Sequence, residues 1–411
     1  MYRLSFAACA VVCLTSLLPA RLPAQLRAFT GVRLVDGTDR PPVANATILL
    51  RDGRVVAAGA AGSVTIPAGA ERIALEGRTV IPGLINSHGH VNGVADLSTY
   101  AAYGITTVYS LGGEPDDVFA ARASQGSASL ARARVYVAGP VLTPTTPDEA
   151  RAQVAAVAAR GVDIVKIRVD DNLGTATKMP ADVSGAVIEE AHRRGLRVAV
   201  HIFYRDDAAS LLAAGADFIA HSVRDAELDA PLLASLKASG RCVSPTLMRE
   251  VSAFVYESTP AFFSDPLFLA HANREWMAQG SDPARQEGVR RSVSAQRYKA
   301  ALEVASRNVK RLADAGVPLA MGTDTGPVGR FQGYFELMEL ERMVQAGLTP
   351  RQALASATQV AAKCLKLDTE IGTLEAGKWG DFVVLDGDPL SDIANVRRIH
   401  SVWIAGNRVA R

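Results

Sequence analysis

Between residues 80 and 325 the sequence alternates short apolar runs with longer alanine-rich segments that repeat apolar positions at helical spacing. Short apolar runs bounded by turn residues are typical of buried strands, and the longer segments are typical of amphipathic helices. We predict eight strands in this region, each followed by a helix. They lie within residues 80–88, 104–111, 134–140, 163–169, 197–203, 218–223, 242–247 and 318–324.

Helix start and stop signals support this alternation. Thr146 is a predicted N-cap, with Pro147 in the first turn, Glu149 closing a capping box and Gly161 as the stop. Residues 349–352 repeat the same start signal. Strands alternating with helices predict an α/β protein with a (β/α)8 TIM barrel. The alternative, an open doubly wound sheet, lacks a glycine-rich phosphate loop after any strand.

Both ends of the chain are β-like. Short apolar runs fill residues 27–60, where Asp52-Gly53 indicates a hairpin turn, and further runs fill residues 380–410, where we expect Gly406-Asn407 to form a turn.

The connection spanning residues 247–317 is unusually long and rich in aromatic side chains. Long inserts in a compact domain are more often functional than accidental. We therefore interpret it as a lid or a pocket wall, and the alternative is an insert that packs on the barrel or on a second subunit of a homo-oligomer.

Residues 1–24 combine Arg3, an apolar stretch and small residues before a break. This pattern predicts a signal peptide cleaved after Ala24, or alternatively after Ala20. The protein would then be exported to the periplasm or outside the cell, without stable insertion in the membrane. An uncleaved anchor is the alternative, although the apolar stretch is short for a spanning helix.

The remaining composition excludes several classes. A net charge of +2 with interspersed charges gives no basic field for nucleic acid. Only Cys242 and Cys364 remain beyond the signal, too few for a disulfide scaffold. Because both lie in apolar segments, we expect buried free thiols.

Polar residues end several of the predicted strands. His88 and His90 share one face of the first strand, and His201, His221 and Asp324 close three others. The carboxyl ends of barrel strands meet at the rim that carries active sites. Five such groups at one rim predict a metal site, in which Gly89 leaves space between two ligands.

Lys166 lies inside an apolar strand, where burial lowers the pKa of an amine. A neutral amine can add carbon dioxide and become a carbamate, an anionic ligand able to bridge two cations. The alternative is that Lys166 forms an ion pair with Asp163 or Asp170, or extends its amine to solvent.

Imidazole and carboxylate ligands suit Zn²⁺, with Mn²⁺ and Fe²⁺ as alternatives. Two divalent metal ions about 3.5–4 Å apart share a bridging hydroxide, a nucleophile at neutral pH. Asp324 is then the expected proton shuttle.

The order of His-Gly-His at 88–90, Lys166, His201, His221 and Asp324 resembles the amidohydrolase superfamily, in its binuclear subtype with a carboxylated lysine. The flanking segments 80–90 and 372–390 are similar to that superfamily's opening and closing segments. The resemblance implies that His88, His90 and Asp324 hold the first metal and His201 and His221 the second, with Lys166 bridging. It also implies a small β-sandwich domain formed by residues 25–80 and 367–411 beside a barrel at 81–366.

Within the superfamily the chain looks most like Xaa-Pro dipeptidases, N-acyl amino acid hydrolases and imidazolonepropionase-like proteins. It departs from the dipeptidase pattern after Lys166 and after His201, in loops that would shape the pocket. The expected function is hydrolysis of amide bonds in small molecules, including dipeptides and N-acyl amino acids. The alternatives are a lactonase or phosphotriesterase, and an inactive scaffold. A deaminase usually has a glutamate soon after the strand-five histidine, which "HIFYRDD" lacks.

Four residues near the predicted rim are candidate substrate contacts. Arg168 follows Lys166 by two positions and can clamp a carboxylate, or pair with Asp170 or Asp171. The others are Tyr204, Arg224 and Tyr109.

Overall fold

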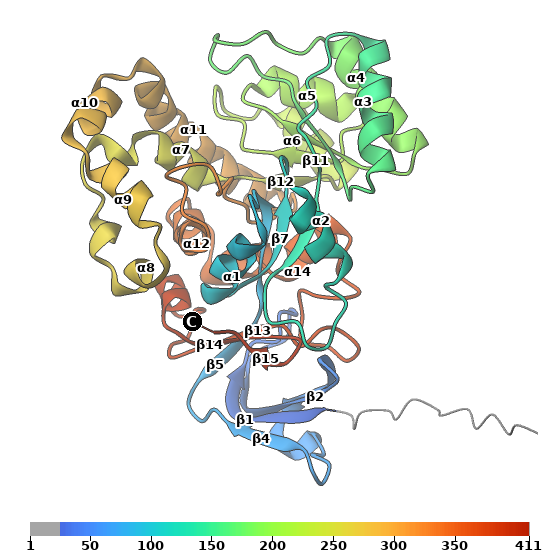
Figure 1. Ribbon diagram of the computed structural model, residues 1–411, viewed down its shortest axis with the longest axis vertical. Coiled ribbons are helices and arrows are strands. Elements are labelled where there is room, and N and C mark those ends of the chain that lie inside the picture. Colours follow the sequence, from blue (N-terminus) through green and yellow to red (C-terminus); the bar gives the residue numbers. More distant parts are fainter. Residues whose placement is uncertain (1–24, 411) are drawn as a thin grey trace, which may run out of the picture.

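The structure is a computed structural model that describes residues 25–410. The predicted signal peptide lies outside the described residues. One body contains parallel strands surrounded by helices, and below it in Figure 1 a sheet combines the two ends of the chain. Within residues 25–410, no helix has both the length and the apolar character needed to cross a bilayer.

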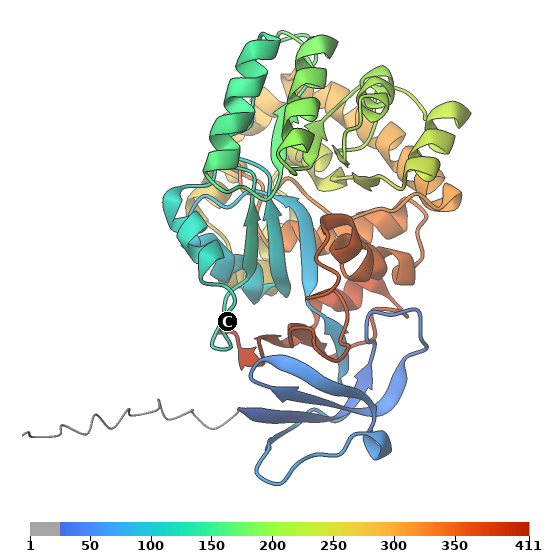
Figure 2. The same ribbon diagram turned by 90° about the vertical axis from the view of Figure 1, so that its right-hand side faces the viewer.

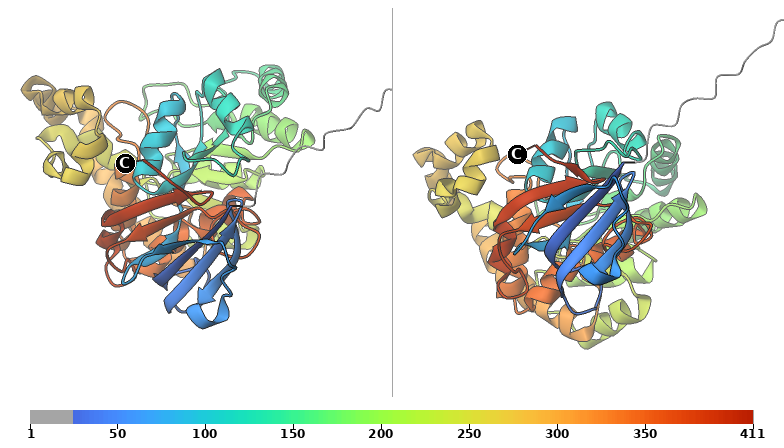
Figure 3. Two further views of the ribbon diagram at one scale, coloured as in Figure 1. Left: turned by 60° about the horizontal axis from the view of Figure 1, so that its bottom comes forward. Right: turned by 90° about the horizontal axis from the view of Figure 1, so that it is seen from below.

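The two ends of the chain share one eight-stranded sheet, seen from below in Figure 3. Phe29 lies with its ring centroid 4.8 Å from those of both Phe382 and Trp403, so strands from the two ends of the chain pack on a common core. The strands are β1 (Leu26–Leu34), β2 (Val43–Arg51), β3 (Arg54–Ala60), β4 (Glu71–Ala74), β5 (Thr79–Pro82), β13 (Phe382–Leu385), β14 (Ile399–Ile404) and β15 (Asn407–Arg408).

The first predicted hairpin turn is confirmed and the second is displaced by one residue. Asp52 and Gly53 join β2 to β3 with φ of 50° and 79°. At the other end Ala405 and Gly406 form the turn, with φ of 48° and 70°. Asn407 belongs to β15, and its side-chain amide donates to the backbone oxygens of Ala128 and Leu130.

The central strands form two parallel sheets. Isolated bridges connect the two sheets. Leu142, which follows β8, pairs with Ile167 of β9, and the segment 319–325 pairs with β12 through Leu319 and with β6 through Thr325. The pairing therefore leads from β6 through all the central strands and back to β6. Figure 2 shows β6, β7 and β8 between helices. The strands are β6 (Leu84–Gly89), β7 (Ile105–Ser110), β8 (Arg134–Val137), β9 (Val165–Arg168), β10 (Val198–His201), β11 (Phe218–Ala220) and β12 (Cys242–Ser244).

The predicted eighth strand, residues 318–324, is not a regular strand. A Cβ at Gly322 would lie 2.2 Å from Ser244 Oγ and 2.8 Å from His88 Cβ, so the glycine permits a close approach to β6 and β12. The amides of Thr323 and Asp324 both donate to the His88 carbonyl, which bends the segment out of a ladder.

Helices follow the central strands as predicted. They are α1 (Val94–Ala102), α2 (Asp116–Ala123), α3 (Pro147–Ala159), α4 (Ala181–Arg193), α5 (Arg205–Ala213), α6 (Ala230–Ser239), α7 (Leu247–Phe254), α8 (Pro266–His271), α9 (Arg274–Ser281), α10 (Pro283–Arg291), α11 (Val293–Ala315), α12 (Tyr334–Gln345), α13 (Pro350–Ser356) and α14 (Gln359–Leu365), with short 3₁₀ turns at Ala61–Ser63, Val255–Glu257, Ala261–Ser264 and Ile393–Arg397.

The capping predictions hold with one difference. Thr349 and Gln352 form a complete capping box at α13. Thr146 caps α3, but the Glu149 carboxylate accepts from the amide and hydroxyl of Thr145, one residue before the cap.

The long connection is helical, with α8 to α10 projecting at the left of Figure 1. Several of its phenylalanines pack against one another, and Phe268 also lines a cavity of about 360 Å³ with His271 and Trp276. Phe263 and Phe268 stack with centroids 5.5 Å apart, and Phe268 meets Phe331 edge-on at 4.8 Å. Both members of the stacked pair are buried, so these rings join the connection to the central body.

The expectation of two free thiols is wrong. Cys242 at the start of β12 and Cys364 near the end of α14 form a disulfide, with Cα atoms 5.8 Å apart and a sequence separation of 122. The apolar surroundings were predicted correctly, but the fold brings together two segments that are distant in sequence.

We expect the paired substitution of Cys242 and Cys364 by alanine to lower the free energy of unfolding by about 2–4 kcal/mol, because the bridge restricts the unfolded chain across a long loop. Urea unfolding of the oxidised protein and of this variant measures the difference. Equal unfolding midpoints and slopes would show that the bridge does not form in the folded protein.

Candidate metal centre

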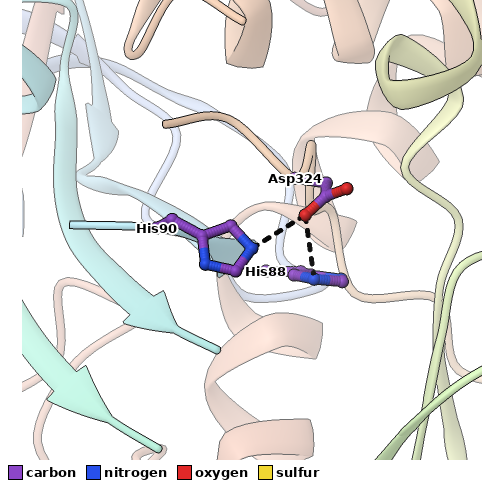
Figure 4. Close-up of side chains that lie close together, drawn as sticks. All are labelled: His88, His90 and Asp324. Atoms are coloured by element: carbon purple, nitrogen blue, oxygen red, sulfur yellow. Dashed lines mark hydrogen bonds and ion pairs between the residues drawn. The ribbon is translucent and has the colours of Figure 1, made fainter. Parts of the chain in front are cut away.

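Three side chains at the end of β6 and in the segment after α11 form a ligand group. The ligand atoms of His88, His90 and Asp324 all lie within 4.8 Å of one another. Asp324 Oδ1 is 2.9 Å from His90 Nε2 and 3.4 Å from His88 Nε2 (Figure 4). Two imidazoles and one carboxylate directed at a common point suit a divalent cation such as Zn²⁺.

The backbone that carries these ligands is strained where it turns. Asp324 has φ of 59°, and His221, which follows β11 directly, has φ of 77°. Residues other than glycine rarely adopt this region, and such strain gathers at functional sites. The prediction for Gly89 is corrected, since a Cβ there would meet Asn86, Tyr100 and Val108 rather than fill the space between the histidines.

The other two histidines lie beside the first group. The His221 and His201 rings are 4.1 Å apart between centroids, with Nε2 of His221 2.7 Å from Nδ1 of His201. The His221 ring is also 4.6 Å from that of His88. The structure therefore brings all four predicted histidines into one contiguous group.

Three of the four imidazoles have a hydrogen-bond partner that orients them, whereas Nδ1 of His88 has none among the described residues. Gly112 O lies 3.0 Å from Nδ1 of His90, and Thr246 Oγ1 lies 2.7 Å from Nδ1 of His221. Asp170 Oδ2 lies 2.8 Å from Nε2 of His201. Such partners set the tautomer and orientation of a ligating histidine.

Lys166 is 3% exposed on β9, and its Nζ has no hydrogen-bond partner. The alternative ion pair with Asp163 or Asp170 does not form; Asp163 instead pairs with Arg122. Burial, only partly offset by Asp324 and Asp170, lowers the pKa of Lys166 to about 7. A buried amine that is readily neutral and has no partner fits the predicted carbamate.

The protonation states also suit ligation. Burial lowers the pKa of His88 and of His201 to about 3, and that of His221 falls well below its usual value for the same reason. Burial raises the pKa of Asp324, but Arg330 and the histidines more than reverse this and hold it well below its usual range. Neutral imidazoles and an ionised carboxylate are the forms that bind cations.

Two of the four candidate substrate contacts lie beside this centre, Arg168 at the end of β9 and Tyr204 at the N-cap of α5. Arg168 Nε donates to Asp170 Oδ1 at 3.0 Å, and both residues line a cavity of about 370 Å³. Other residues lining this cavity include Thr143, Thr145, Lys178 and Met179. The Tyr204 hydroxyl donates to Asp171 at 2.8 Å.

The other two candidates are placed differently from the prediction. Arg224 is buried, donates to the carbonyls of Ile202 and Ser222 and lies 3.0 Å from Glu250, so it is part of the scaffold. Tyr109 is also buried, and its hydroxyl is directed toward Asp163 O, before β9 begins. Both side chains are buried, and neither is among the residues that line the cavity beside Arg168.

The sequence reasoning missed two residues that contact candidate ligands, Arg330 and Asp170, and a third, Glu114, that acts through Gly112. Arg330 NH1 lies 2.5 Å from Asp324 Oδ2, and Asp170 joins His201 to Arg168. Glu114 accepts from the amides of Gly112 and Gly139 and so fixes the carbonyl that orients His90. Asp170 was considered only as a partner of Lys166 or Arg168, and only the fold reveals these contacts.

Comparison with known proteins gives an independent result. The sequence profile of the Amidohydrolase family matches residues 79–409. An uncharacterized protein of Mycobacterium tuberculosis is 27% identical over 360 residues, covering 81% of this chain and 85% of that protein. An imidazolonepropionase of Streptomyces griseus is 26% identical over 400 residues, covering 92% and 95%. A solved Xaa-Pro dipeptidase with bound methionine shares the fold, with a TM-score of 0.75 at 20% identity, covering 94% and 100% of the two chains.

Proposed function

The chain belongs to the amidohydrolase family, and on this premise we propose that it hydrolyses amide bonds in small molecules at a binuclear metal centre. As a family member it is a hydrolase of carbon–nitrogen bonds. The finer proposal names dipeptides and N-acyl amino acids as the substrate class. We also propose that the central strands β6 to β12, closed by the segment 319–325, form a (β/α)8 barrel. The strands from both chain ends would form a β-sandwich domain.

One observation carries the proposal. A buried lysine amine with no hydrogen-bond partner lies close enough to His88, His201 and Asp324 for charge on one group to affect the pKa of another. In a purely structural site this amine would remain unsatisfied, which is costly. Uptake of carbon dioxide, with loss of one proton, converts it into an anionic ligand. His88, His90 and Asp324 would hold one cation and His201 and His221 the other, with Lys166 between them.

The chain's own residues supply positioning and proton transfer. Bound divalent cations polarise a carbonyl oxygen and lower the pKa of water to about 7. Asp324 Oδ1 faces both His88 and His90, which supports the proposal that its carboxylate accepts the proton of the attacking water and returns it to the leaving nitrogen. Arg330 holds the other oxygen and keeps this carboxylate ionised before the proton arrives.

Arg168 is the proposed reader of a substrate carboxylate, because only its Nε is engaged by Asp170. We expect Arg168→Met to raise KM for carboxylate-bearing substrates about 10- to 100-fold with little change in kcat, since a charged hydrogen bond contributes about 1.5–3 kcal/mol. Steady-state kinetics on an N-acyl amino acid and its amide measures this. Arg193→Met on α4 is the control, and an unchanged KM in Arg168→Met would refute the role.

Metal analysis and a hydrolysis screen test the proposed function together. Purified protein should contain divalent metal and cleave members of a panel of dipeptides and N-acyl amino acids. Turnover confined to lactones or phosphotriesters would favour the alternative hydrolase, which uses the same centre. Protein without stoichiometric metal and without turnover would indicate a scaffold.

We also propose that the protein is exported. The Cys242–Cys364 bridge supports this, because structural disulfides persist in oxidising compartments and are rare in the cytosol. Detection of the protein, shortened at its N-terminus, in a periplasmic or extracellular fraction tests the proposal.

A further inference from the structure

Helix α12 carries two buried carboxylates on one face. Glu336 and Glu339 are three residues apart, so they lie one above the other on the helix. Both are 0% exposed, and neither forms an ion pair with another described residue. Burying a carboxylate without a cation is costly, and apolar side chains would pack α12 equally well. Each carboxylate must therefore be retained for the hydrogen bonds that it accepts.

Glu336 binds the segments that carry the first ligand group. Its Oε1 accepts hydrogen bonds from Asn86 Nδ2, Thr323 Oγ1 and Thr325 Oγ1, each at 2.6 Å. Asn86 in turn accepts from the His88 amide at 2.9 Å. The two threonines flank Asp324. One carboxylate oxygen thus links β6 to the bent segment 323–325. This is where these two segments bring His88, His90 and Asp324 together.

Glu339 binds the segment that orients the second ligand group. Its two oxygens accept from the amides of Leu247 and Met248 at 2.7 and 2.6 Å, in the first turn of α7. These amides follow Thr246, which has φ of 52°. The Thr246 hydroxyl is the group that contacts Nδ1 of His221. Glu339 therefore fixes the strained turn that sets the orientation of this imidazole.

We infer that α12 is a positioning helix for the metal centre, with Glu336 aligning the ligands of one cation and Glu339 those of the other. This inference rests on the proposed function. Partners behind metal ligands typically change metal affinity 10- to 100-fold when removed. The two glutamates act on different ligands, so their effects should be separable by site.

Titration of the metal-free full-length protein with Co²⁺, followed by its visible absorption, tests the inference. Wild type should bind two ions. Glu336→Gln should weaken one binding step about 10- to 100-fold, and Glu339→Gln the other. Glu341→Gln is the matched control, because its carboxylate lies on the same helix but pairs with Arg397. Thermal unfolding of each variant reports its folding, and Thr323→Val replaces Glu336→Gln if the latter does not fold.

A double-mutant comparison assigns the steps. In an Asp324→Asn background, Glu336→Gln should cause little further loss of Co²⁺ affinity, because the step it affects is already weakened. Glu339→Gln should still weaken the binding step that involves His221. Two unchanged binding steps in both glutamine variants would overturn the inference and leave the proposed function intact. Equal weakening of both steps by either variant would also overturn it, since that indicates general destabilisation. Wild type that binds no Co²⁺ would refute the proposed function, and the inference with it.

Discussion

Replacement of Lys166 by alanine should remove bound metal and activity together. The Nζ atom has no hydrogen-bond partner in the protein. If Lys166 had only a structural role, its truncation would therefore change metal content and activity little. If Lys166 bridges two cations, however, its removal leaves them without a common anionic ligand. We expect kcat/KM to fall at least about 1,000-fold, because the metals supply several kcal/mol of transition-state stabilisation.

Metal content and hydrolysis measured on the same Lys166→Ala preparation check this expectation. Lys237→Ala on α6 is the matched control, because this lysine is exposed and remote from the ligand group. Circular dichroism of both variants should match that of wild type. Full turnover with full metal content in Lys166→Ala would contradict the bridging role.

Asp324→Asn should abolish turnover by a different route. An amide keeps the shape of the side chain but neither carries the charge that faces His88, His90 and Arg330 nor accepts a proton at neutral pH. General base catalysis contributes about 10²–10⁴-fold, and weakened metal binding adds to this loss. We therefore expect kcat to fall by at least about 1,000-fold.

The control for Asp324→Asn is Asp206→Asn, an exposed carboxylate in the first turn of α5. Assays at saturating metal separate the two contributions, since added metal restores occupancy but not a proton acceptor. A variant that regains wild-type kcat in excess metal would show that Asp324 is a ligand only and that another group carries the proton.

The centre was more predictable than its surroundings, for a physical reason. Alternating side-chain direction places His88 and His90 on one face, and parallel strands bring their carboxyl ends to one rim, so short-range rules predicted which candidate ligands lie together. His201 and His221 follow the same rules, and the structure places their rings in contact. The burial of Lys166 followed from its apolar neighbours in sequence.

Features that depend on contacts between distant segments were not predictable. The bend at Gly322 replaces a strand because Ser244 and His88 approach that residue, and the Cys242–Cys364 bridge joins segments 122 residues apart. Strand position alone suggested that Tyr109 reaches the mouth, but its hydroxyl is directed toward the amino end of β9. Glu336 and Glu339 resemble ordinary helix residues until the fold shows what their oxygens accept.

The most direct test of the binuclear centre is a crystal structure of the zinc-loaded protein with anomalous data at the zinc edge. Two peaks should appear about 3.5–4 Å apart. One should lie about 2.0–2.2 Å from ligand atoms of His88, His90 and Asp324 and the other equally close to His201 and His221, with additional density on Lys166 Nζ between them. A single peak, or peaks away from these side chains with Lys166 unmodified, would contradict it.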